Sequence, residues 1–309
     1  MRISLKMKQF ECLIIGGGPA GYTAGIYACR AGLQTALVEG PEPGGQLTTT
    51  SLIENYPGFE NGVNALQLMS SMRKQAERLG TEIISGTACR FDLHKKEIYL
   101  KSGESINYKA LIIATGASAK YLGIEGEERF KGMGVSGCAT CDGFFFKDKV
   151  VAVVGGGDTA CEDALYLSGI AKKVYMIVRK DYLRASAIMQ KKVKATGNIE
   201  ILFNTVTKEL LGDALGLSAA KLSRNSEELE LAIDGFFLAI GRHPNTEWLD
   251  GALPLNDNGY IISDGVKTTI AGVYVAGDVR NTDYRQAVTA AADGCRAALE
   301  AEKYIKDEL

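Results

Sequence analysis

The segment Glu11–Gly21 reads ECLIIGGGPAG, a short apolar run that leads directly into a glycine-rich loop. Helical spacing follows over residues 22–31, Gly32 ends it, and a second apolar run covers residues 33–38. This order predicts a βαβ unit that binds a dinucleotide, because loop glycines let backbone N–H groups approach a pyrophosphate at a helix N-terminus. The residues that we expect at the phosphate are Gly16, Gly18, Pro19, Ala20 and Gly21.

The second apolar run ends in a carboxylate. Glu39 stands 18 positions after Gly21 and is followed by Gly40. A carboxylate at this point of the unit accepts hydrogen bonds from the free hydroxyls of an adenosine ribose, and it would repel a 2′-phosphate. We therefore expect Glu39 and Gly40 to belong to a site for FAD or NAD and not for NADP.

A second unit of the same kind begins at Lys149. An apolar run at 150–154 leads into GGGDTA at 155–160, a helical pattern covers 158–168, and another apolar run covers 173–178. No acid ends this run, but three cations follow it, and guanidinium groups pair with phosphate through two hydrogen bonds. The cations predict NADPH, the alternative being a solvated basic turn. The expected contacts are Gly155, Gly157, Asp158, Thr159, Arg179, Lys180 and Arg184.

The two loops bracket a closely spaced cysteine pair, Cys138 and Cys141, which Asp142 follows. A structural zinc site needs four ligands, and the chain has only two histidines and this one pair, so we expect no metal. A redox disulfide is the favoured interpretation, because CxxC thiols have lowered pKa values. Asp142 can carry a proton for a thiolate or cap a helix, and both roles stay open. The scattered cysteines are expected to be small buried side chains: Cys12, Cys29, Cys89, Cys161 and Cys295.

Length and spacing predict an α/β chain of two domains. Single cores stop growing at roughly 250–300 residues, and this chain has 309. The loops start 139 positions apart, and the stretch after Gly241 is too short for a third domain, so we expect it to complete the first. The second domain is then an insertion with hinges near Ala117 and His243, which gives the ranges 1–117, 118–243 and 244–309.

Hydrophobic spacing predicts further elements around the two units. A helix is expected over 64–79, with Leu66, Met69, Ala76 and Leu79 on its apolar face, and a long helix over 286–305. Strands are expected at 82–84, 97–101, 105–109, 110–114 and 236–240, the second and third of them forming a hairpin.

The composition narrows the classes of partner. The formal net charge is −2 and 46% of the residues are hydrophobic, which argues against a nucleic-acid surface or an anionic membrane as partner. No apolar run reaches the ~20 residues that span a bilayer. The last four residues, Lys306–Leu309, spell a retention signal of the endoplasmic reticulum. We interpret that match as chance, because no export signal is seen, and expect a cytoplasmic protein.

Taken together, the motifs closely resemble those of the low-molecular-weight thioredoxin reductases, over nearly the whole chain. Besides the loops, the cations and the CxxC pair, the resemblance rests on GGQL at 44–47, IENYPG at 53–58, ATGA at 114–117, GD at 277–278 and YRQA at 284–287. It implies two Rossmann-like nucleotide-binding domains of three layers (β/β/α), the second inserted in the first. It also implies FAD in the outer domain, NADPH in the inserted one, and a homodimer.

The resemblance implies roles for single residues as well. Gln46 and Asn55 would line the flavin pocket, and Asp278 would hold the ribityl chain. At the flavin ring, where a positive helix end stabilises reduced flavin, would lie Arg285, Gln286 and Ala287. Cys141 would lie against the flavin, and Cys138 would attack the disulfide of thioredoxin. Phe144 and Phe145 would help to dock thioredoxin, with burial in the core as the alternative.

The implied activity is thioredoxin-disulfide reduction, in which a hydride passes from NADPH to FAD and the electron pair then reaches the Cys138–Cys141 disulfide. Because that pair and the nicotinamide site share one domain, we expect the domain to rotate between half-reactions. The alternatives are a flavin-dependent dithiol oxidase, which would not need the three cations, and a non-catalytic FAD and disulfide redox sensor. One departure is Val178-Arg179-Lys180, where many bacterial members have His-Arg-Arg, so weaker NADPH affinity or looser discrimination against NADH is expected.

Overall fold

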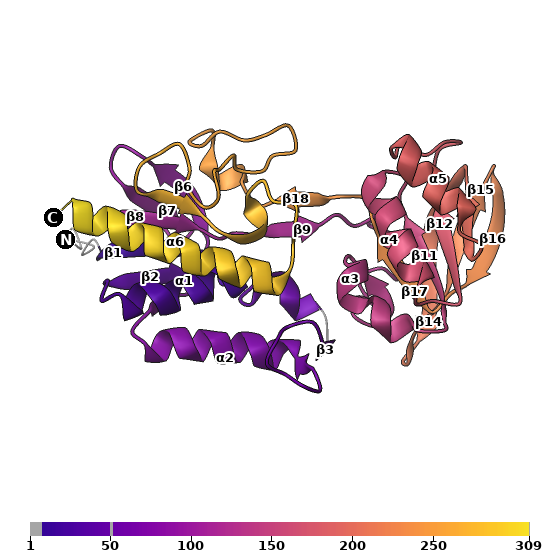
Figure 1. Cartoon of the computed structure of the whole chain (residues 1–309), viewed down its shortest axis with the longest axis horizontal. Helices are drawn as coiled ribbons and strands as arrows, with labels where there is room; N and C mark the ends of the chain where they lie inside the picture. The colour runs from indigo at the N-terminus through magenta and orange to yellow at the C-terminus, as the bar shows by residue number, and fades with distance from the viewer. Residues whose placement is uncertain (1–7, 50–51, 309) are drawn as a thin grey trace. The chain divides into compact units, whose positions relative to one another are not determined.

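The computed structural model describes residues 8–49 and 52–308. The chain folds into two compact units (Figure 1). Unit 1 comprises Met1–Ser118 and His243–Leu309, and unit 2 comprises Ala119–Arg242. The chain passes from one unit to the other twice, and the two crossing segments, β9 (Ala117–Ala119) and β18 (Arg242–Pro244), pair as a small sheet.

Unit 1 is built on a seven-stranded sheet. Its parallel strands are β5 (Glu82–Ile84), β2 (Thr35–Val38), β1 (Lys8–Ile15), β8 (Ser105–Ile113) and β19 (Val273–Val275). Two antiparallel strands, β7 (Glu97–Leu100) and β6 (Ala88–Asp92), extend it beyond β8. A separate two-stranded sheet joins β3 (Leu52–Ile53) to β4 (Val63–Asn64).

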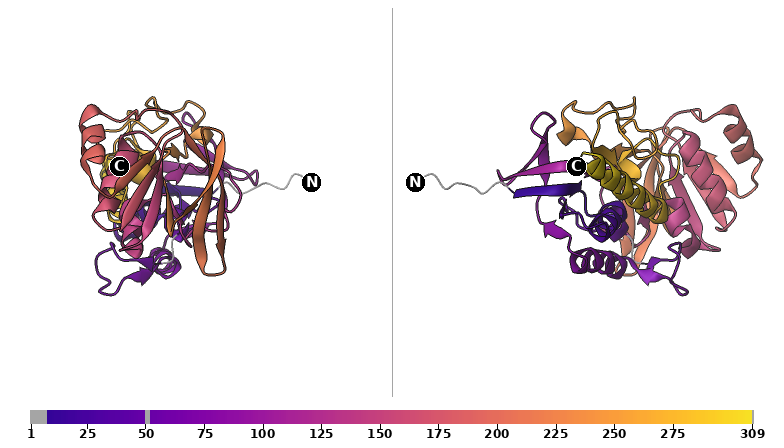
Figure 2. Two further views of the ribbon diagram at one scale, coloured as in Figure 1. Left: turned by 90° about the vertical axis from the view of Figure 1, so that its right-hand side faces the viewer. Right: turned by 60° about the vertical axis from the view of Figure 1, so that its left-hand side comes forward.

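The alternation of side chains along β1 places two cores on the two faces of this sheet. Cys12 and Ile14 lie in the core beneath the helices, whereas Leu13 and Ile15 lie in the opposite core, which also contains Phe91 of β6. The helices are α1 (Pro19–Arg30), α2 (Ala65–Arg78) and α6 (Ala287–Asp307), and α1 and α6 lie side by side (Figures 1 and 2). Short 3₁₀ turns lie at η1 (Gly45–Thr49), η3 (Glu247–Leu249) and η4 (Gly277–Val279).

Unit 2 repeats the arrangement with three clear layers. Its parallel sheet has the order β10 (Val135–Ser136), β17 (Gly235–Leu238), β11 (Val150–Val154), β12 (Lys173–Ile177) and β13 (Ile199–Leu202). The helices α4 (Asp158–Ser168) and α5 (Ala187–Ala195) pack on one face, where Val151 and Val153 point. The antiparallel sheet β14 (Thr205–Asp213), β15 (Gly216–Arg224) and β16 (Glu227–Ala232) packs on the other, where Ala152 and Val154 point (Figure 2). The fold class predicted from the sequence is confirmed.

Two predictions about local structure are wrong. The segments 105–109 and 110–114 form one strand, β8, because β1 pairs with it from Ile106 to Ile113. Its first residues also pair with β7 and its last with β19. In α2, Leu66 is 61% exposed, and the buried face consists of Ala65, Leu68, Met69, Met72 and Ala76. The helix begins one residue later than expected, since the Asn64 side chain accepts a hydrogen bond from the backbone N–H of Gln67 and serves as its N-cap.

The expectation that all five scattered cysteines are buried is also wrong. Cys12 and Cys161 are buried, Cys29 and Cys295 are half-buried, and Cys89 is exposed. Cys89 lies on β6, a strand at the edge of the sheet, where the pleat turns alternate side chains to solvent. Burial raises the pKa of the Cys12 thiol to about 12, so that thiol stays protonated. Among the described residues, no helix combines the length and the apolar character that crossing a membrane requires.

The close packing of α1 on α6 generates a stability prediction. A β-carbon on Gly294 of α6 would lie 2.1 Å from the backbone oxygen of Ala20 in α1. We expect Gly294→Ala to lower the free energy of unfolding by about 1–3 kcal/mol, measured as the shift in the urea midpoint. Gly197→Ala is the matched control, since nothing lies within 4 Å of a β-carbon there. Equal midpoints for the two variants would contradict the packing argument.

Candidate active site: two dinucleotide loops and a dithiol

Three of the four glycines in the loop of unit 1 serve three different purposes. Gly16 has φ +120°, and a β-carbon on it would lie 2.2 Å from the Ala114 carbonyl oxygen. A β-carbon on Gly21 would lie 1.8 Å from the Gly16 carbonyl oxygen, so this glycine lets α1 begin close to the strand. A β-carbon on Gly18 would meet nothing within 4 Å, so this glycine leaves bare backbone at the start of α1. The glycines of a dinucleotide-binding G-x-G-x-x-G loop have these same three functions. The second glycine of that pattern, here Gly18, faces the pyrophosphate.

Other segments predicted for this site gather around the same loop. The N–H of Gly44 donates to the Gly17 carbonyl, and a β-carbon on Gly45 would lie 3.6 Å from Gly18 Cα, which brings η1 with Gln46 to the loop. On the other side, a β-carbon on Gly277 would lie 3.1 Å from Ala20 Cβ, which brings the turn with Asp278 to the start of α1. Residues predicted from three distant parts of the sequence therefore lie together.

Glu39 is 5% exposed and already has two partners. The Tyr22 hydroxyl donates to its Oε1 at 2.8 Å, and Arg73 Nε donates to the same oxygen at 2.7 Å. Burial, followed by the bond to Glu39, raises the pKa of the Tyr22 phenol, and the bond to Glu39 raises the pKa of Arg73. Since a carboxylate offers about four acceptor positions, Glu39 can still accept a ribose hydroxyl. Arg73, on α2, had no signal in the sequence that linked it to Glu39.

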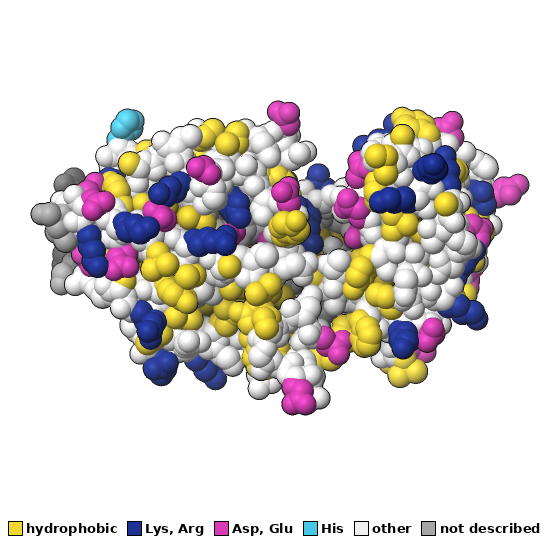
Figure 3. All heavy atoms as spheres, in the orientation of Figure 1, with side chains coloured by type: hydrophobic (Ala, Val, Ile, Leu, Met, Phe, Trp, Pro, Cys, Tyr) yellow, Lys and Arg dark blue, Asp and Glu magenta, His cyan; other side chains and the backbone are white. Residues whose placement is uncertain are grey.

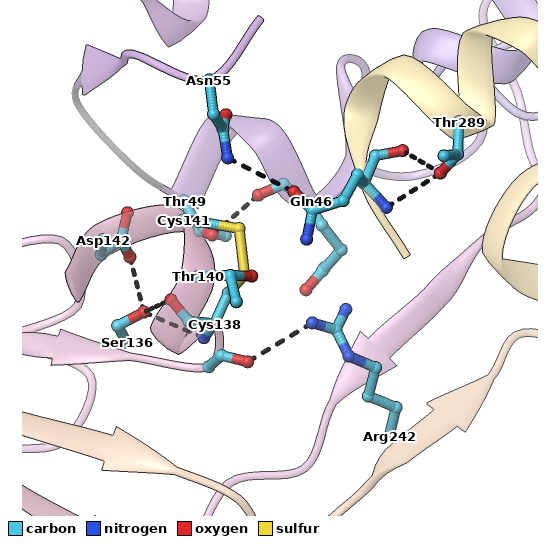
Figure 4. The surroundings of a disulfide bond; sticks show 12 residues. Gln46, Thr49, Asn55, Ser136, Cys138, Thr140, Cys141, Asp142, Arg242 and Thr289 are labelled. Carbon is cyan, nitrogen blue, oxygen red and sulfur yellow. Dashed lines mark hydrogen bonds between the residues drawn. A yellow bond between two sulfur atoms is a disulfide. The ribbon is translucent and has the colours of Figure 1, made fainter. Parts of the chain in front are cut away.

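The predicted flavin-ring residues lie at the start of α6. Gln286 is the N-cap, its side chain and that of Thr289 form a capping box, and its Oε1 accepts a hydrogen bond from Asn55 Nδ2 at 3.3 Å (Figure 4). The Arg285 guanidinium lies 4.7 Å from the centre of the Tyr260 ring, and its Nε is buried with no hydrogen-bond partner among the described residues. A buried donor without a partner fits a site for a polar ring such as isoalloxazine.

Asp293 holds this end of α6 to the Asp278 turn, and it was missed in the sequence. It is 4% exposed and pairs with Arg280, whose Nε lies 2.7 Å from Oδ2, while the N–H of Gly277 donates to the same oxygen. A buried ion pair whose remaining positions are hydrogen-bonded fixes geometry more than it adds stability. Here the pair fixes the turn that carries Asp278.

The loop of unit 2 repeats the glycine pattern of unit 1. Gly155 has φ +144°, and a β-carbon on it would lie 2.5 Å from the Ala239 carbonyl oxygen. Gly157 precedes α4, and a β-carbon on it would meet nothing within 4 Å. Asp158 and Thr159 occupy the first turn of α4, where Asp158 Oδ1 accepts a hydrogen bond from the N–H of Ser186 at 2.9 Å, which lowers the pKa of the carboxyl. The loop thus provides a second site at which uncovered backbone N–H groups can bind a phosphate.

The basic segment after β12 is tied to this second loop. The N–H of Arg184 donates to the Gly156 carbonyl at 2.7 Å, and buried Leu183 packs toward Gly156. The three cations themselves are exposed: Arg179, Lys180 and Arg184. The structure therefore brings them to the end of the parallel sheet at which a dinucleotide binds.

Cys138 and Cys141 form a disulfide with an S–S distance of 2.06 Å (Figure 4). Cys138 is the N-cap of α3 (Ala139–Asp142), which packs against α4 through buried Ala139. The Ser136 hydroxyl donates to Asp142 Oδ2 at 2.5 Å and accepts from the N–H of Cys138 at 3.0 Å. Ser136 was not predicted; through it, Asp142 is connected to the backbone of the reactive pair. Asp142 is the last residue of α3, where it makes no capping hydrogen bond to a helix.

A second unpredicted residue, Arg242, supports the other side of the pair. Its guanidinium donates to the Gly137 carbonyl at 3.4 Å, directly before Cys138 (Figure 4). Arg242 also lowers the pKa of Asp163 on α4, but burial outweighs it and raises that pKa to about 6. Arg242 thus links the backbone directly before the dithiol to a half-buried carboxyl through its charge.

The phenylalanines after the pair differ in exposure. Phe144 is 60% exposed, Phe145 is half-buried, and Phe146 packs edge-on against Phe237 with ring centres 5.2 Å apart. They belong to η2 (Gly143–Phe146). No cluster of metal-binding side chains occurs in residues 8–49 and 52–308, and on the face drawn in Figure 3 basic and acidic side chains are interspersed.

Comparison with known proteins identifies the family. The family model described as pyridine nucleotide-disulphide oxidoreductase matches residues 10–294. The chain belongs to this family. It is therefore an oxidoreductase, and membership implies FAD and NADPH as cofactors, which the two loops fit.

Individual relatives of this pyridine nucleotide-disulphide oxidoreductase cover almost all of it. The thioredoxin reductase of Escherichia coli O157:H7 is 48% identical, across 96% of this chain and 97% of that protein. A Pseudomonas fluorescens protein named glucosaminate ammonia-lyase is 46% identical, across 97% of each. The solved structure of thioredoxin reductase from Giardia duodenalis superposes with a TM-score of 0.92 at 39% identity, covering 97% of this chain and 100% of that one.

The raised pKa of Asp163 predicts a pH dependence of stability. Between its unfolded value of about 4 and its folded value of about 6, the native carboxyl holds a proton that the unfolded chain has lost, so stability falls as the pH rises. We expect Asp163→Asn to be more stable than the parent protein by roughly 1–3 kcal/mol at pH 7.5, with the gain vanishing near pH 4. Urea unfolding at both pH values measures it. Exposed Glu228→Gln is the control, and a gain for Asp163→Asn that does not vary with pH would contradict the argument.

Proposed function

We propose that the protein is an NADPH-dependent thioredoxin-disulfide reductase. The observation that carries the proposal is a formed Cys138–Cys141 disulfide in the same unit as a glycine loop flanked by three cations. A dithiol accepts two electrons, which is the number that a nicotinamide delivers. Thioredoxin reductases with nearly full-length similarity support the choice of protein substrate.

The residues of unit 1 would hold FAD. Gly16, Gly18, Pro19, Ala20 and Gly21 would bind its pyrophosphate, and Glu39 with Gly40 its adenosine ribose. Asp278 would bind the ribityl chain, and the ring would lie near Gln46, Asn55, Arg285, Gln286 and Ala287. When bound, FAD takes a hydride from NADPH and supplies the electron pair that reduces a disulfide. The protein contributes the positive end of α6, which favours negative charge at the ring.

The residues of unit 2 would hold NADPH and carry out thiol chemistry. Gly155, Gly157, Asp158 and Thr159 would lie at the pyrophosphate, and Arg179, Lys180 and Arg184 at the 2′-phosphate. Once reduced, Cys138 gives its thiol proton to Asp142 and, as a thiolate, attacks one sulfur of the thioredoxin disulfide. The departing thioredoxin thiolate then takes that proton from Asp142. The Cys141 thiolate then attacks Cys138, which restores the internal disulfide and releases the second thioredoxin thiolate.

Partner, assembly and location complete the proposal. Phe144 is exposed, lies three residues after Cys141 and suits an anchor for thioredoxin, and half-buried Phe145 would assist it. A homodimer is supported by apolar side chains at the surface of α1 and α6. Tyr27, Val288 and Leu299 are each at least 40% exposed, and hydrophobic side chains gather over this region of unit 1 (Figure 3).

A cytoplasmic location suits a reductase of thiols, since that compartment is reducing.

Three alternative functions would require different parts of the site. A flavin-dependent dithiol oxidase would pass electrons to oxygen and would not need the exposed cations after β12. A non-catalytic redox sensor would show no turnover, and an ammonia-lyase would not need the disulfide. NADPH oxidation that requires thioredoxin, measured in parallel with NADH, identifies the reductase and excludes the sensor. Oxygen uptake with a dithiol in the absence of NADPH would identify the oxidase, and ammonia release from glucosaminate would identify the lyase.

The first functional prediction concerns the two cysteines. We expect Cys138→Ser to abolish thioredoxin reduction, by at least about 10³-fold, because it removes the sulfur that attacks the substrate. Cys141→Ser keeps an attacking thiol at Cys138 and should trap thioredoxin as a mixed disulfide, seen by mass spectrometry under non-reducing conditions. Full activity of Cys138→Ser would rule the scheme out.

The second prediction separates the two cofactors. An added methyl group at Gly157 or Gly18 meets no protein atom within 4 Å, so both variants should fold. Gly157→Ala should raise the KM for NADPH by about tenfold or more while the protein stays yellow, because the methyl group occupies space needed by the pyrophosphate. Gly18→Ala should lose FAD, measured as absorbance per chain after purification. FAD loss in Gly157→Ala with full retention in Gly18→Ala would reverse the assignment.

A further inference from the structure

A lysine–tyrosine pair lies within the basic segment that follows β12. Lys180 Nζ donates a hydrogen bond to the Tyr182 hydroxyl at 2.8 Å. The same ammonium lies 5.0 Å from the centre of the Tyr182 ring, so its principal contact is with the hydroxyl and not with the ring face. Both side chains are exposed, Tyr182 at 51%, which leaves them accessible to a ligand.

The backbone around this pair is held firmly at the dinucleotide end of the sheet. The Lys180 carbonyl accepts a hydrogen bond from the N–H of Asn204 at 3.1 Å. On the other side of Tyr182, Leu183 is buried at 4% exposure, and the N–H of Arg184 donates to the Gly156 carbonyl of the phosphate loop. Lys180 and Tyr182 are therefore presented from a fixed turn beside the loop.

The chemistry of the pair differs from that of lysine alone. A lysine ammonium is a compact point charge, whereas arginine offers two parallel N–H donors that match a phosphate. A tyrosine hydroxyl that accepts one hydrogen bond still has its own hydrogen to donate. Lys180 and Tyr182 together therefore offer an N–H and an O–H donor at neighbouring positions, which is the pattern that an arginine at position 180 would supply.

We propose that Tyr182 determines specificity for NADPH, by donating its hydroxyl to the 2′-phosphate while it holds the Lys180 ammonium in place. The inference rests on the proposed placement of NADPH at Arg179, Lys180 and Arg184. It assigns to Tyr182 a function that the sequence patterns did not indicate. Asp181 is the one carboxylate within residues 179–184, and its negative charge opposes the binding of a phosphate. The Tyr182 hydroxyl, a neutral donor, would offset part of that repulsion.

Tyr182→Phe is the direct test, because it keeps the ring and removes the hydroxyl. The kcat/KM for NADPH should fall about tenfold, the effect of losing one hydrogen bond to a charged group, while the kcat/KM for NADH stays unchanged. Tyr99→Phe is the matched control, since it removes a tyrosine hydroxyl that donates to Glu97 in unit 1. Equal losses with NADPH and NADH, as expected if the ring merely stacks on adenine, would overturn the proposal, and so would no loss at all.

A binding measurement tests the same point without turnover. By calorimetry, Tyr182→Phe should weaken the Kd of 2′,5′-ADP about tenfold and leave that of 5′-AMP unchanged. In a Lys180→Met background the same change should have a smaller effect, because paired groups do not act additively. Adding Lys180→Arg to Tyr182→Phe should restore binding of 2′,5′-ADP. Additive losses or a failure of this rescue would contradict the pairing.

These results distinguish the inference from the assignment on which it rests. If the parent protein binds 2′,5′-ADP no better than 5′-AMP, the placement of NADPH at this segment is wrong. If the parent protein discriminates and Tyr182→Phe discriminates equally well, the placement stands and the role of Tyr182 is wrong.

Discussion

Both units depend on one close backbone contact, made where the strand before each glycine loop, β1 or β11, leads into its helix. In unit 1 a β-carbon on Gly16 would collide with the carbonyl of Ala114, and in unit 2 one on Gly155 would collide with that of Ala239. Only glycine allows the neighbouring strand to end so close to the loop at these positive φ angles. The contact sets where each helix begins, and with it where bare N–H groups face a phosphate.

The two units differ at the end of the strand that follows the loop and its helix, which is β2 in unit 1 and β12 in unit 2. This difference suits the two loops to different nucleotides. Glu39 is buried and held by Tyr22 and Arg73, which suits a ribose that carries no phosphate. The corresponding end in unit 2 presents exposed cations on a turn tied to its own loop, which suits a 2′-phosphate. Under the proposed assignment, one scaffold would hold a flavin dinucleotide in unit 1 and a nicotinamide dinucleotide in unit 2. The short helix α3, which carries Cys141, packs on α4, the helix that follows the second loop.

The features that could be predicted from the sequence are those that depend on the order of neighbouring segments along the chain. Strand, glycine loop and helix follow one another within about thirty residues in each unit, so the two βαβ units were readable. The sheet β14–β16 was missed because the inward positions at the start of β14 are Thr205 and Thr207, which hide the hydrophobic alternation. Long-range partners were missed too: Arg73 reaches Glu39 across 34 positions, and Arg242 reaches Gly137 across 105. Such contacts follow from tertiary packing and leave no periodic signal.

The central claim is that electrons from NADPH reach the sulfur atoms of Cys138 and Cys141 and leave on thioredoxin. The most direct measurement is mass spectrometry of alkylated cysteines in the FAD-loaded protein, under anaerobic conditions, before and after NADPH and then after oxidised thioredoxin. The account predicts that Cys138 and Cys141 become alkylated together once NADPH is added. It also predicts that they return to the disulfide as an equal number of thiols forms on thioredoxin. A Cys138–Cys141 disulfide that persists in the presence of NADPH and a reduced flavin would contradict it.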